Sequence, residues 1–155
     1  MKYRIAELLC VAAAVVFIVF SLAINAETTK TAEEISVGIT QKVDYSSLKK
    51  RDTKFFRKTF DISADEFDGI VYYSSDNVMD VSEILVIKLS GSSDSENTMK
   101  MLEKYVDSRY KIFAAYAPEQ GEMLKNRILK KSGNVIFMYI GKDSEAAMDA
   151  FNKTV

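Results

Sequence analysis

A run of thirteen apolar residues near the N-terminus constrains this chain more than any other feature. Lys2 and Arg4 precede the run, which extends from Leu8 to Phe20, and Leu22–Ile24 continues it after Ser21. A positive start, an apolar middle and small residues at the end are typical of an export signal or a membrane anchor. The run has no polar face, which disfavours a buried amphipathic helix. The positive-inside rule then places the rest of the chain outside the cytoplasmic membrane.

Two fates remain open for this segment. A spanning helix needs about 20 apolar residues, and the stretch from Ile5 to Ile24 reaches that length if it includes Glu7. The length favours an uncleaved anchor, which predicts a single-pass membrane protein with its C-terminal domain outside. Cleavage after Ala23 would instead give a secreted protein, because small residues occupy the positions that a signal peptidase reads. Cys10 lies before the end of the apolar core, so it is misplaced for lipid attachment.

Composition excludes several kinds of chemistry from the rest of the chain. The sequence has no histidine, and its single cysteine is Cys10. These absences exclude Ser-His-Asp and Cys-His catalysis, the usual zinc sites and disulfide bonds. No phosphate-binding loop or dinucleotide glycine pattern is present, so no cofactor and no enzymatic activity are expected. A formal net charge of −1 provides no basic footprint for nucleic acid.

The remaining patterns predict one α+β domain. We expect residues 1–26 to form the anchor or signal peptide, 27–34 a tether and 35–155 the domain. The expected helices cover 31–43, 45–58, 93–116, 118–124 and 143–151, and capping boxes begin the first at Thr31 and the third at Ser93. The expected strands are 69–73, 81–89, 128–131 and 135–140. Together they predict an antiparallel or mixed sheet of about four strands, with helices packed on one face.

The 81–89 segment is the strongest of these strands. Ile84, Leu85, Val86 and Ile87 are four adjacent apolar residues, which indicates burial on both faces. This strand is therefore expected at the centre of the sheet.

Basic residues gather in the stretch after the first helix. The candidate interaction patch consists of Lys49, Lys50, Arg51, Lys54, Arg57 and Lys58. Such a patch near a membrane could bind an anionic lipid, a wall polymer or an envelope protein. The alternative is a solvated helix whose charges complement the acidic stretch from Asp61 to Glu83 within the same fold.

Two further groups have weaker functional interpretations. Tyr116, Pro118 and Glu119 lie at a helix–helix junction and form a candidate surface knuckle, although a packed bend is the favoured interpretation. The acidic residues between 76 and 83 could supply oxygen ligands to a hard cation. Their spacing matches no known calcium loop, and the favoured interpretation is an ordinary turn followed by a strand.

Three segments carry a resemblance to a known family: Met79–Lys88, Tyr116–Gln120 and Gly133–Phe137. Their order behind an N-terminal apolar segment resembles an exported family of clostridia and related Gram-positive bacteria, catalogued as the domain of unknown function numbered four-three-five-eight. The resemblance covers roughly residues 35–153. It implies an extracytoplasmic, membrane-tethered or lipid-tethered location, and it implies no activity.

The sequence therefore predicts a membrane-anchored, non-catalytic binding or interaction module of the bacterial cell envelope. Two alternatives stay open. One is an envelope hydrolase that uses a pair of facing carboxylates. The other is a small-molecule or lipid sensor, which predicts an apolar pocket between the sheet and the helices.

Overall fold

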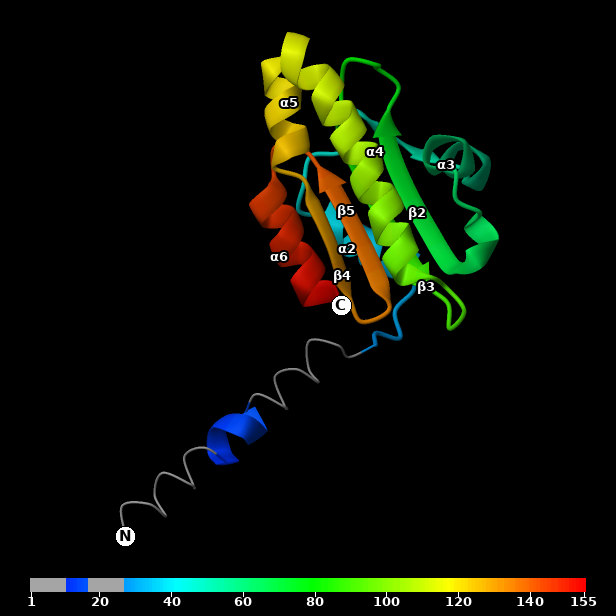
Figure 1. Ribbon diagram of the computed structural model, residues 1–155, viewed down its shortest axis with the longest axis vertical. Helices are drawn as coiled ribbons and strands as arrows, with labels where there is room; N and C mark the ends of the chain where they lie inside the picture. The colour runs from blue at the N-terminus through cyan, green and yellow to red at the C-terminus, as the bar shows by residue number, and fades with distance from the viewer. Residues whose placement is uncertain (1–10, 17–26) are drawn as a thin grey trace.

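The computed structural model describes residues 11–16 and 27–155 (Figure 1). Residues 11–16 are helical. The rest of the predicted anchor or signal peptide lies outside the described residues, as do Cys10 and the cleavage point after Ala23. Among the residues that are described, no helix is both long enough and apolar enough to cross a membrane.

Five antiparallel strands form one sheet in the order β1-β2-β3-β5-β4. They are β1 (Leu48–Arg51), β2 (Phe67–Ser75), β3 (Glu83–Leu89), β4 (Ile128–Ser132) and β5 (Val135–Ile140). Every residue of β3 and β5 is buried, as expected for central strands made of continuous apolar runs. The edge strands are short and carry lysines, which protects an open sheet edge from pairing with other chains.

The helices begin and end largely where the sequence predicts. They are α2 (Ala32–Thr40), α3 (Thr53–Phe60), α4 (Ser95–Tyr116), α5 (Pro118–Lys125) and α6 (Ser144–Thr154), with a 3-10 turn at Ala64–Glu66. The Thr31 capping box is present, and Pro118 begins α5 because its missing N–H costs nothing in a first turn. The predicted capping box at Ser93 is wrong, because Asp94 caps α4 by accepting the Asn97 N–H at 2.9 Å.

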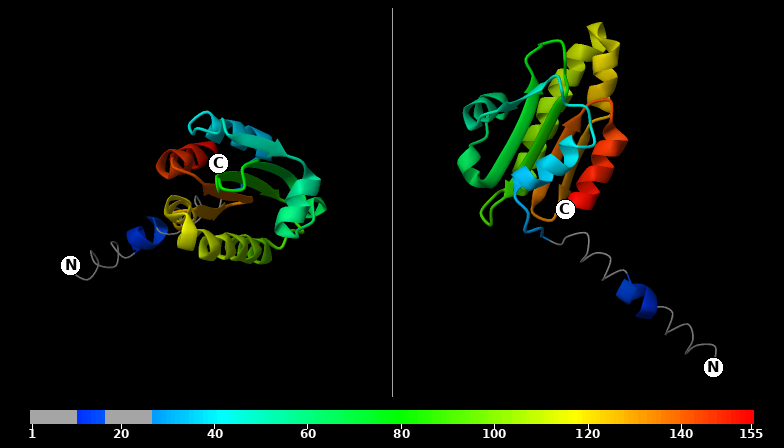
Figure 2. Two further views of the ribbon diagram at one scale, coloured as in Figure 1. Left: turned by 90° about the horizontal axis from the view of Figure 1, so that it is seen from above. Right: turned by 180° about the vertical axis from the view of Figure 1, so that it is seen from behind.

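Helices cover both faces of the sheet, which corrects the expectation of one covered face. Figure 2 shows α2 and α6 on one side and α4 and α5 on the other, with α3 beside α4. The side chains of β3 alternate between the two cores: Leu85 and Ile87 pack with α3 and α4, whereas Ile84 and Val86 pack with α2 and α6. The burial of β3 on both faces already required two helical layers.

The sheet has a fifth strand that the sequence does not predict. Residues 45–58 were expected to be helical, but only the part from Thr53 onward is helical, as α3, whereas residues 48–51 form β1 and pair with β2. Lys49 and Lys50 have no strong strand preference, so the pairing comes from the exposed edge of β2 and not from local propensity. Asp52 then ends the strand and caps α3 by accepting the Phe55 N–H at 2.7 Å.

The start of the domain is attached to one end of the sheet. Lys88 Nζ donates to the Thr28 carbonyl and to Asn134 Oδ1, and the Thr28 N–H donates to the same Asn134 oxygen at 3.2 Å. Residues 32–34, which were expected in the tether, form the first turn of α2. We call this end of the sheet, where Lys88 pairs with Val135, the proximal end.

The opposite end of the sheet is the distal end, where Glu83 pairs with Ile140. It lies five residues along β3 from the proximal end, or about 17 Å at the usual strand rise. Figure 1 shows that the α4–α5 junction lies at the distal end, far from the blue segment that leads into α2.

Candidate functional site

A cleft opens at the distal end of the sheet. This distal cleft has a volume of about 590 Å³ and lies between the connections that follow α2, β2 and β5 and the first turns of α5. Its polar lining includes Asp44, Asp80, Gln120, Tyr139, Lys142 and Asp143. A Cβ on Gly141 would lie 2.5 Å from the Tyr139 hydroxyl oxygen, so a larger residue here would require the Tyr139 ring to shift.

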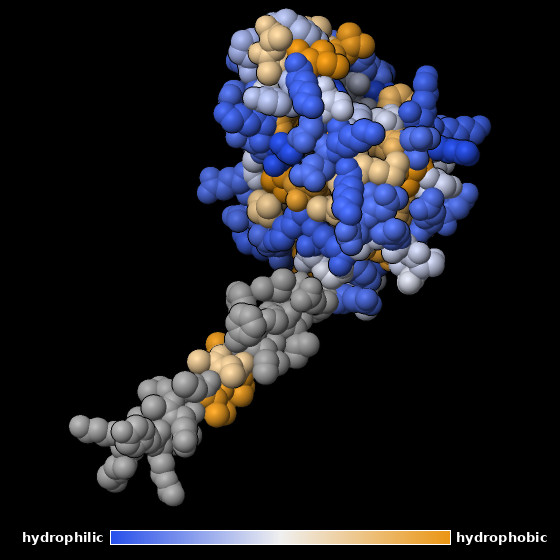
Figure 3. Space-filling view, in the orientation of Figure 1, coloured by the Kyte–Doolittle hydropathy of each residue, from blue (hydrophilic) through white to orange (hydrophobic). Residues whose placement is uncertain are grey.

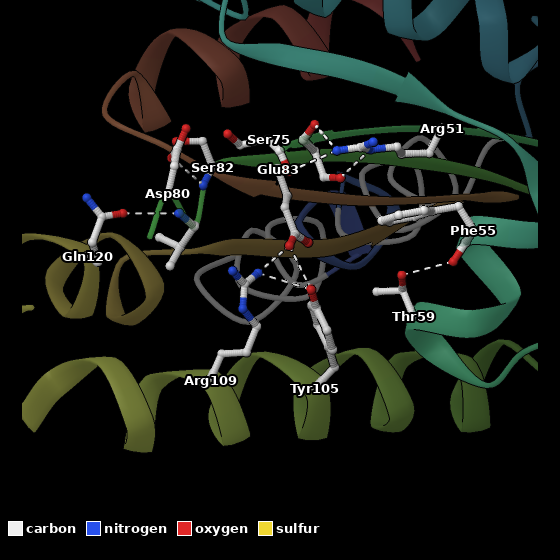
Figure 4. A network of polar contacts seen from close by, with 12 residues as sticks. Arg51, Phe55, Thr59, Ser75, Asp80, Ser82, Glu83, Tyr105, Arg109 and Gln120 are labelled. Carbon is white, nitrogen blue, oxygen red and sulfur yellow. Dashed lines mark hydrogen bonds and ion pairs between the residues drawn. The ribbon is translucent and has the colours of Figure 1, made fainter. Parts of the chain in front are cut away.

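The loop between β2 and β3 forms one wall of the cleft and is held by one of its own side chains and by one from α5. Asp80 Oδ1 accepts the Ser82 N–H at 3.0 Å, and Gln120 of α5 accepts the Val81 N–H at 3.1 Å (Figure 4). Burial alone would raise the pKa of Asp80, but hydrogen bonds from serines, chiefly Ser82, outweigh burial and lower the pKa. Asp80 therefore carries its negative charge at neutral pH.

A buried charge cluster lies beside this loop, between β3 and α4. Glu83 is only 3% exposed and points from β3 toward α4, where Tyr105 and Arg109 point back at it (Figure 4). Glu83 Oε1 accepts the Tyr105 O–H at 2.7 Å and forms an ion pair with Arg109. Tyr105 and Arg109 are four residues apart, so one face of α4 presents both.

The second carboxylate oxygen of Glu83 has no hydrogen bond from any described residue, although less than 1 Å² of it is exposed. An unsatisfied buried polar atom costs about 1–3 kcal/mol, and more when it is charged. Burial raises the pKa of Glu83, and the nearby Arg109 charge and the Tyr105 and Tyr72 hydroxyls only partly oppose this. The pKa of Arg109 is raised too: burial alone would lower it, and the negative charge of Glu83 outweighs that cost.

A small cavity, which we call the Glu83 hollow, lies over this cluster. Its volume is about 150 Å³, and α3, α4, β2 and the 76–82 loop contribute to its wall. Phe55, Tyr72 and Val78 provide apolar surface, whereas Thr59 and Asn77 provide polar groups. The hollow and the distal cleft share Asn77 and Asp80, so both cavities border the same loop.

The structure separates the predicted basic patch into two groups. Lys49 and Arg51 form ion pairs with Asp76, and Lys50 pairs with Glu33 at 2.6 Å. Arg51 also donates to Ser74 and Ser75 and lies over the Phe55 ring at 4.5 Å. The second group is exposed on α3, and no ion pair within the described residues involves it: Lys54, Arg57 and Lys58.

The predicted knuckle is exposed at the distal end. Tyr116 is 55% exposed and its ring packs on Phe113, so it is not buried beneath the bend. Pro118 and Glu119 are exposed in the first turn of α5.

The acidic residues of the 76–83 segment do not share a site. Asp76 faces the basic side chains of β1, Asp80 caps its own loop, and Glu83 is buried against α4. Within residues 11–16 and 27–155, no group of three or more acidic or thiol side chains is placed to hold a metal ion.

The α4 face carries hydrophobic atoms only in separate groups. Figure 3 shows hydrophilic side chains over most of this face. A groove of about 370 Å³ between α3 and α4 includes Phe60, Met101 and Ile112, together with the charged Lys104 and Arg109. It lies between two helices and not between the sheet and the helices, where the sensor hypothesis expects a pocket.

The family model described as a domain of unknown function (DUF4358) matches residues 41–141. The chain belongs to the DUF4358 family. The match confirms the resemblance found in the sequence. No curated protein and no solved structure matches the chain.

The DUF4358 match covers all five strands and helices α3 to α5. The Glu83 cluster and all of the Glu83 hollow lie within it, whereas α2 and α6 lie outside it. The matched part of this DUF4358 chain therefore contains a complete sheet with one covered face.

Sequence reasoning identified Glu83 as an acidic turn residue and missed its role in a buried cluster. Two signals were present. Glu83 directly precedes the apolar run of β3, and Tyr105 and Arg109 follow the buried Leu102 by three and seven residues on α4. Neither signal names the partner, because the acid and the arginine are 26 residues apart in this DUF4358 chain.

Proposed function

We propose that this protein is a membrane-tethered, extracytoplasmic binding module of the cell envelope, with no catalytic role. The N-terminal sequence supports the location, since a positive start and a long apolar run are typical of an anchor. The binding surface of this module is the distal cleft, and its size is the single observation that carries this assignment. A volume of about 590 Å³ lies within the usual range for ligand and peptide sites.

The position of the cleft suits a tethered module. The described domain begins at the proximal end, where Thr28 is bound to Lys88 and Asn134. A binding surface at the other end of β3 would face away from the membrane to which the tether leads. The cleft is lined by mixed charges and amides, which can orient a polar partner by hydrogen bonds.

Site-specific photo-crosslinking in the producing cells tests the distal cleft. A photoreactive residue replaces Lys142, which is exposed and lines the cleft. The matched control replaces Lys131, which is exposed on β4 near the proximal end. We expect one reproducible adduct of defined mass from position 142 and none from 131. Equal adducts from both positions, or no adduct from either, would contradict binding at the distal cleft.

The mass of the mature protein tests the tether. An intact N-terminus in the membrane fraction supports the anchor, whereas loss of residues 1–23 contradicts it and indicates a secreted protein. Cleavage would leave the distal cleft unchanged, so this measurement and the crosslinking experiment can fail independently.

The exposed cations of α3 offer a second contact for an anionic lipid or wall polymer. Lys54, Arg57 and Lys58 share one short helix, and exposed charge pairs are weakened by salt. Binding of an anionic wall polymer to the full chain should therefore fall as salt rises. A variant in which glutamine replaces all three of these residues should lose that salt dependence. The contact would be contradicted if the variant bound the polymer with the same salt dependence as the wild type.

An envelope hydrolase is the second candidate, and one observation favours it. Asp80 and Glu83 both line the Glu83 hollow, and their pKa values are shifted in opposite directions. Such a difference is the pattern by which one carboxyl serves as acid and another as base. Hydrolysis of envelope glycans by the wild type, lost in both Asp80→Asn and Glu83→Gln, would support this candidate. Equal activity in the wild type and both variants would contradict it.

A further inference from the structure

The groove between α3 and α4 presents apolar side chains to solvent. Phe60 is buried at its floor, Met101 is half-buried, and Ile112 is 58% exposed. The volume of about 370 Å³ lies within the usual range for binding sites. Thr59 of α3 and Arg109 of α4 line both this groove and the Glu83 hollow, so the two cavities adjoin. Exposed apolar surface in a concave place is typical of an interaction site.

The apolar side chains of α4 form a stripe along the groove. Met101, Tyr105 and Ile112 are separated by about one and two helical turns, so they share one side of the helix. The distance along α4 from Met101 to Ile112 is about 16 Å. A partner helix would cover this length with about three turns, if its apolar side chains recur at the i, i+4, i+7 and i+11 spacing of groove-binding helices.

Lysines form both rims of the groove. Each of five exposed lysines directly precedes a residue that lines the groove or the adjoining hollow: Lys54, Lys58, Lys100, Lys104 and Lys111. Successive residues of a helix are turned by about 100°, so each lysine lies beside the lining residue and further from the core. Lys100 pairs with Glu96, and no ion pair in the described part of the chain involves the other four.

The charges of the groove favour an acidic partner. Among the described residues that line it, Asp61 has the only carboxylate. Arg109 is already paired with Glu83, so it adds no free positive charge. The four lysines without ion pairs exceed this single acid, and opposite charges on a partner would speed its association and fix its orientation.

The shape of the groove favours a helix over a lipid surface. Phe60 is 5% exposed and lies below the lysine rims on α3 and α4. A flat bilayer would meet the lysines and leave this floor uncovered. An amphipathic helix can instead place one row of side chains between the rims and keep its polar face in water.

We propose that the α3–α4 groove binds an acidic amphipathic helix of another protein. Its apolar side chains cover Met101 and Ile112, and its carboxylates face the lysine rims. The groove shares no lining residue with the distal cleft, so this partner is additional to the one proposed there. It also differs from a wall polymer at the α3 cations, because a hydrophilic polymer gains nothing from the apolar floor.

Nuclear magnetic resonance of the full chain in nanodiscs of zwitterionic lipid tests the proposal. The probe is a helix-stabilised peptide of about 18 residues, with leucines at the i, i+4, i+7 and i+11 positions and glutamates at most others. The readout is the methyl shift of Met101 and Ile112. We expect saturable shifts at peptide concentrations below about 1 mM, and none for Met148 of α6 on the other face of the sheet.

Two control peptides separate the apolar and the charged contributions. A scrambled peptide has the same composition but no apolar stripe, and a second peptide has lysine in place of every glutamate. Neither should shift the two methyl groups of the wild type. A saturable shift of equal size with the scrambled peptide would show a contact by charge alone, and it would overturn the proposal.

An apolar substitution tests the floor of the groove. Ile112→Ser removes the exposed end of the apolar stripe, so binding of the acidic peptide should weaken about tenfold, measured at the Met101 methyl. Val37→Ser, at an exposed valine of α2, is the matched control and should bind like the wild type. Equal affinity of Ile112→Ser and the wild type would overturn the proposal.

A charge reversal tests the rims. Lys58→Glu combined with Lys104→Glu should weaken binding of the acidic peptide at least about tenfold and allow the lysine peptide to bind. All substituted side chains are exposed, so the fold should persist. Lys131→Glu combined with Lys153→Glu is the matched control, at exposed lysines of β4 and α6. An equal loss in both double variants would show a general charge effect and contradict the rims.

Two further outcomes would overturn the proposal. The absence of any saturable shift with the acidic peptide would show that the groove does not bind such a helix. Shifts of both methyl groups in nanodiscs that contain phosphatidylglycerol, without peptide, would show that the groove faces an anionic lipid surface.

Discussion

Glu83 is the residue whose chemistry departs most from its surroundings. It is the only acidic residue that is buried in the described part of the chain, and it lies at the end of a strand that is otherwise apolar except for Lys88. Its ion pair with Arg109 joins β3 to α4. A buried ion pair of this kind adds little net stability, but removal of one partner leaves an uncompensated charge.

The raised pKa of Glu83 predicts a pH-dependent stability. Above the ordinary carboxyl pKa of 4.5, the unfolded state releases its proton before the folded state does. The free energy of unfolding should therefore fall as pH rises, until Glu83 is ionised in both states. Each unit of pKa difference changes it by about 1.4 kcal/mol. Glu83→Gln has no titrating carboxyl at this position. Urea unfolding at several pH values should therefore show the wild type losing stability relative to the variant as pH rises.

Glu145→Gln is the control for this measurement, because Glu145 is exposed on α6 and remote from the cluster. This variant should follow the wild type at every pH. If the wild type instead gained stability relative to Glu83→Gln as pH rises, the Arg109 charge would outweigh burial, and the predicted direction would be wrong.

At the scale of elements, the β1–α3 connection depends on Arg51. Its guanidinium donates to the Ser74 hydroxyl at 2.8 Å and to the Ser75 carbonyl at 2.9 Å, and it stacks on Phe55. These contacts attach an edge strand of four residues to β2 and orient α3. A planar guanidinium can make all of them at once, whereas an ammonium cannot.

Arg51→Lys should therefore weaken the attachment of β1. We expect a loss of about 1–3 kcal/mol in the free energy of unfolding, together with faster amide exchange in β1. Lys49→Arg, on the same strand but exposed, should change stability by less than about 0.5 kcal/mol. Equal effects of the two substitutions would contradict a structural role for Arg51.

The α4–α5 junction depends on Gly121. A Cβ at this position would lie 3.0 Å from the Ala114 Cα, which is backbone and cannot rotate away. Alanine in a helix normally gains about 1 kcal/mol over glycine, but overpacking costs about 1–3 kcal/mol. Gly121→Ala should therefore lower the midpoint of thermal unfolding. Gly91→Ala, where nothing lies within 4 Å of the new Cβ, should leave it unchanged, and a stabilised Gly121→Ala would contradict close helix packing.

At the scale of the whole molecule, the contacts of Thr28 determine where the tether leaves the domain. Lys88 is 9% exposed and donates to the Thr28 carbonyl and to Asn134. Lys88→Met should free this segment, so amide exchange at Thr28 should become faster. Lys131→Met, at an exposed lysine, is the control. Unchanged protection of the Thr28 amide in Lys88→Met would show that the segment is not held by these contacts.

Much of the fold could be predicted from the sequence because the signals are local. Apolar runs predicted β3 and β5, helical spacing predicted α4, and Pro118 placed the start of α5. The hairpin across Gly133 was also predicted, and that glycine has a φ of 52°, which favours glycine. These features depend on neighbours within a few residues, which is why propensity and periodicity detect them.

The candidate site could not be predicted in the same way, because its members come from distant segments. Of the six residues of the predicted basic patch, Arg51 is largely buried as a structural contact, two lysines of β1 are exposed in ion pairs, and three residues remain exposed on α3. The Glu83 hollow combines α3, α4, β2 and the 76–82 loop. Only the packing of the α3–α4 layer against the sheet brings these groups together.

The sequence by itself determined the main helices, four of the five strands and the absence of histidine and cysteine chemistry beyond residue 26. Tertiary structure alone decided that β1 joins the sheet, that helices cover both faces, and that Glu83 meets Arg109. The physical reason is the sequence separation between the residues that interact. Turns, caps and periodic faces are fixed by neighbouring residues, whereas edge pairing and buried ion pairs depend on which segments the folded sheet brings together.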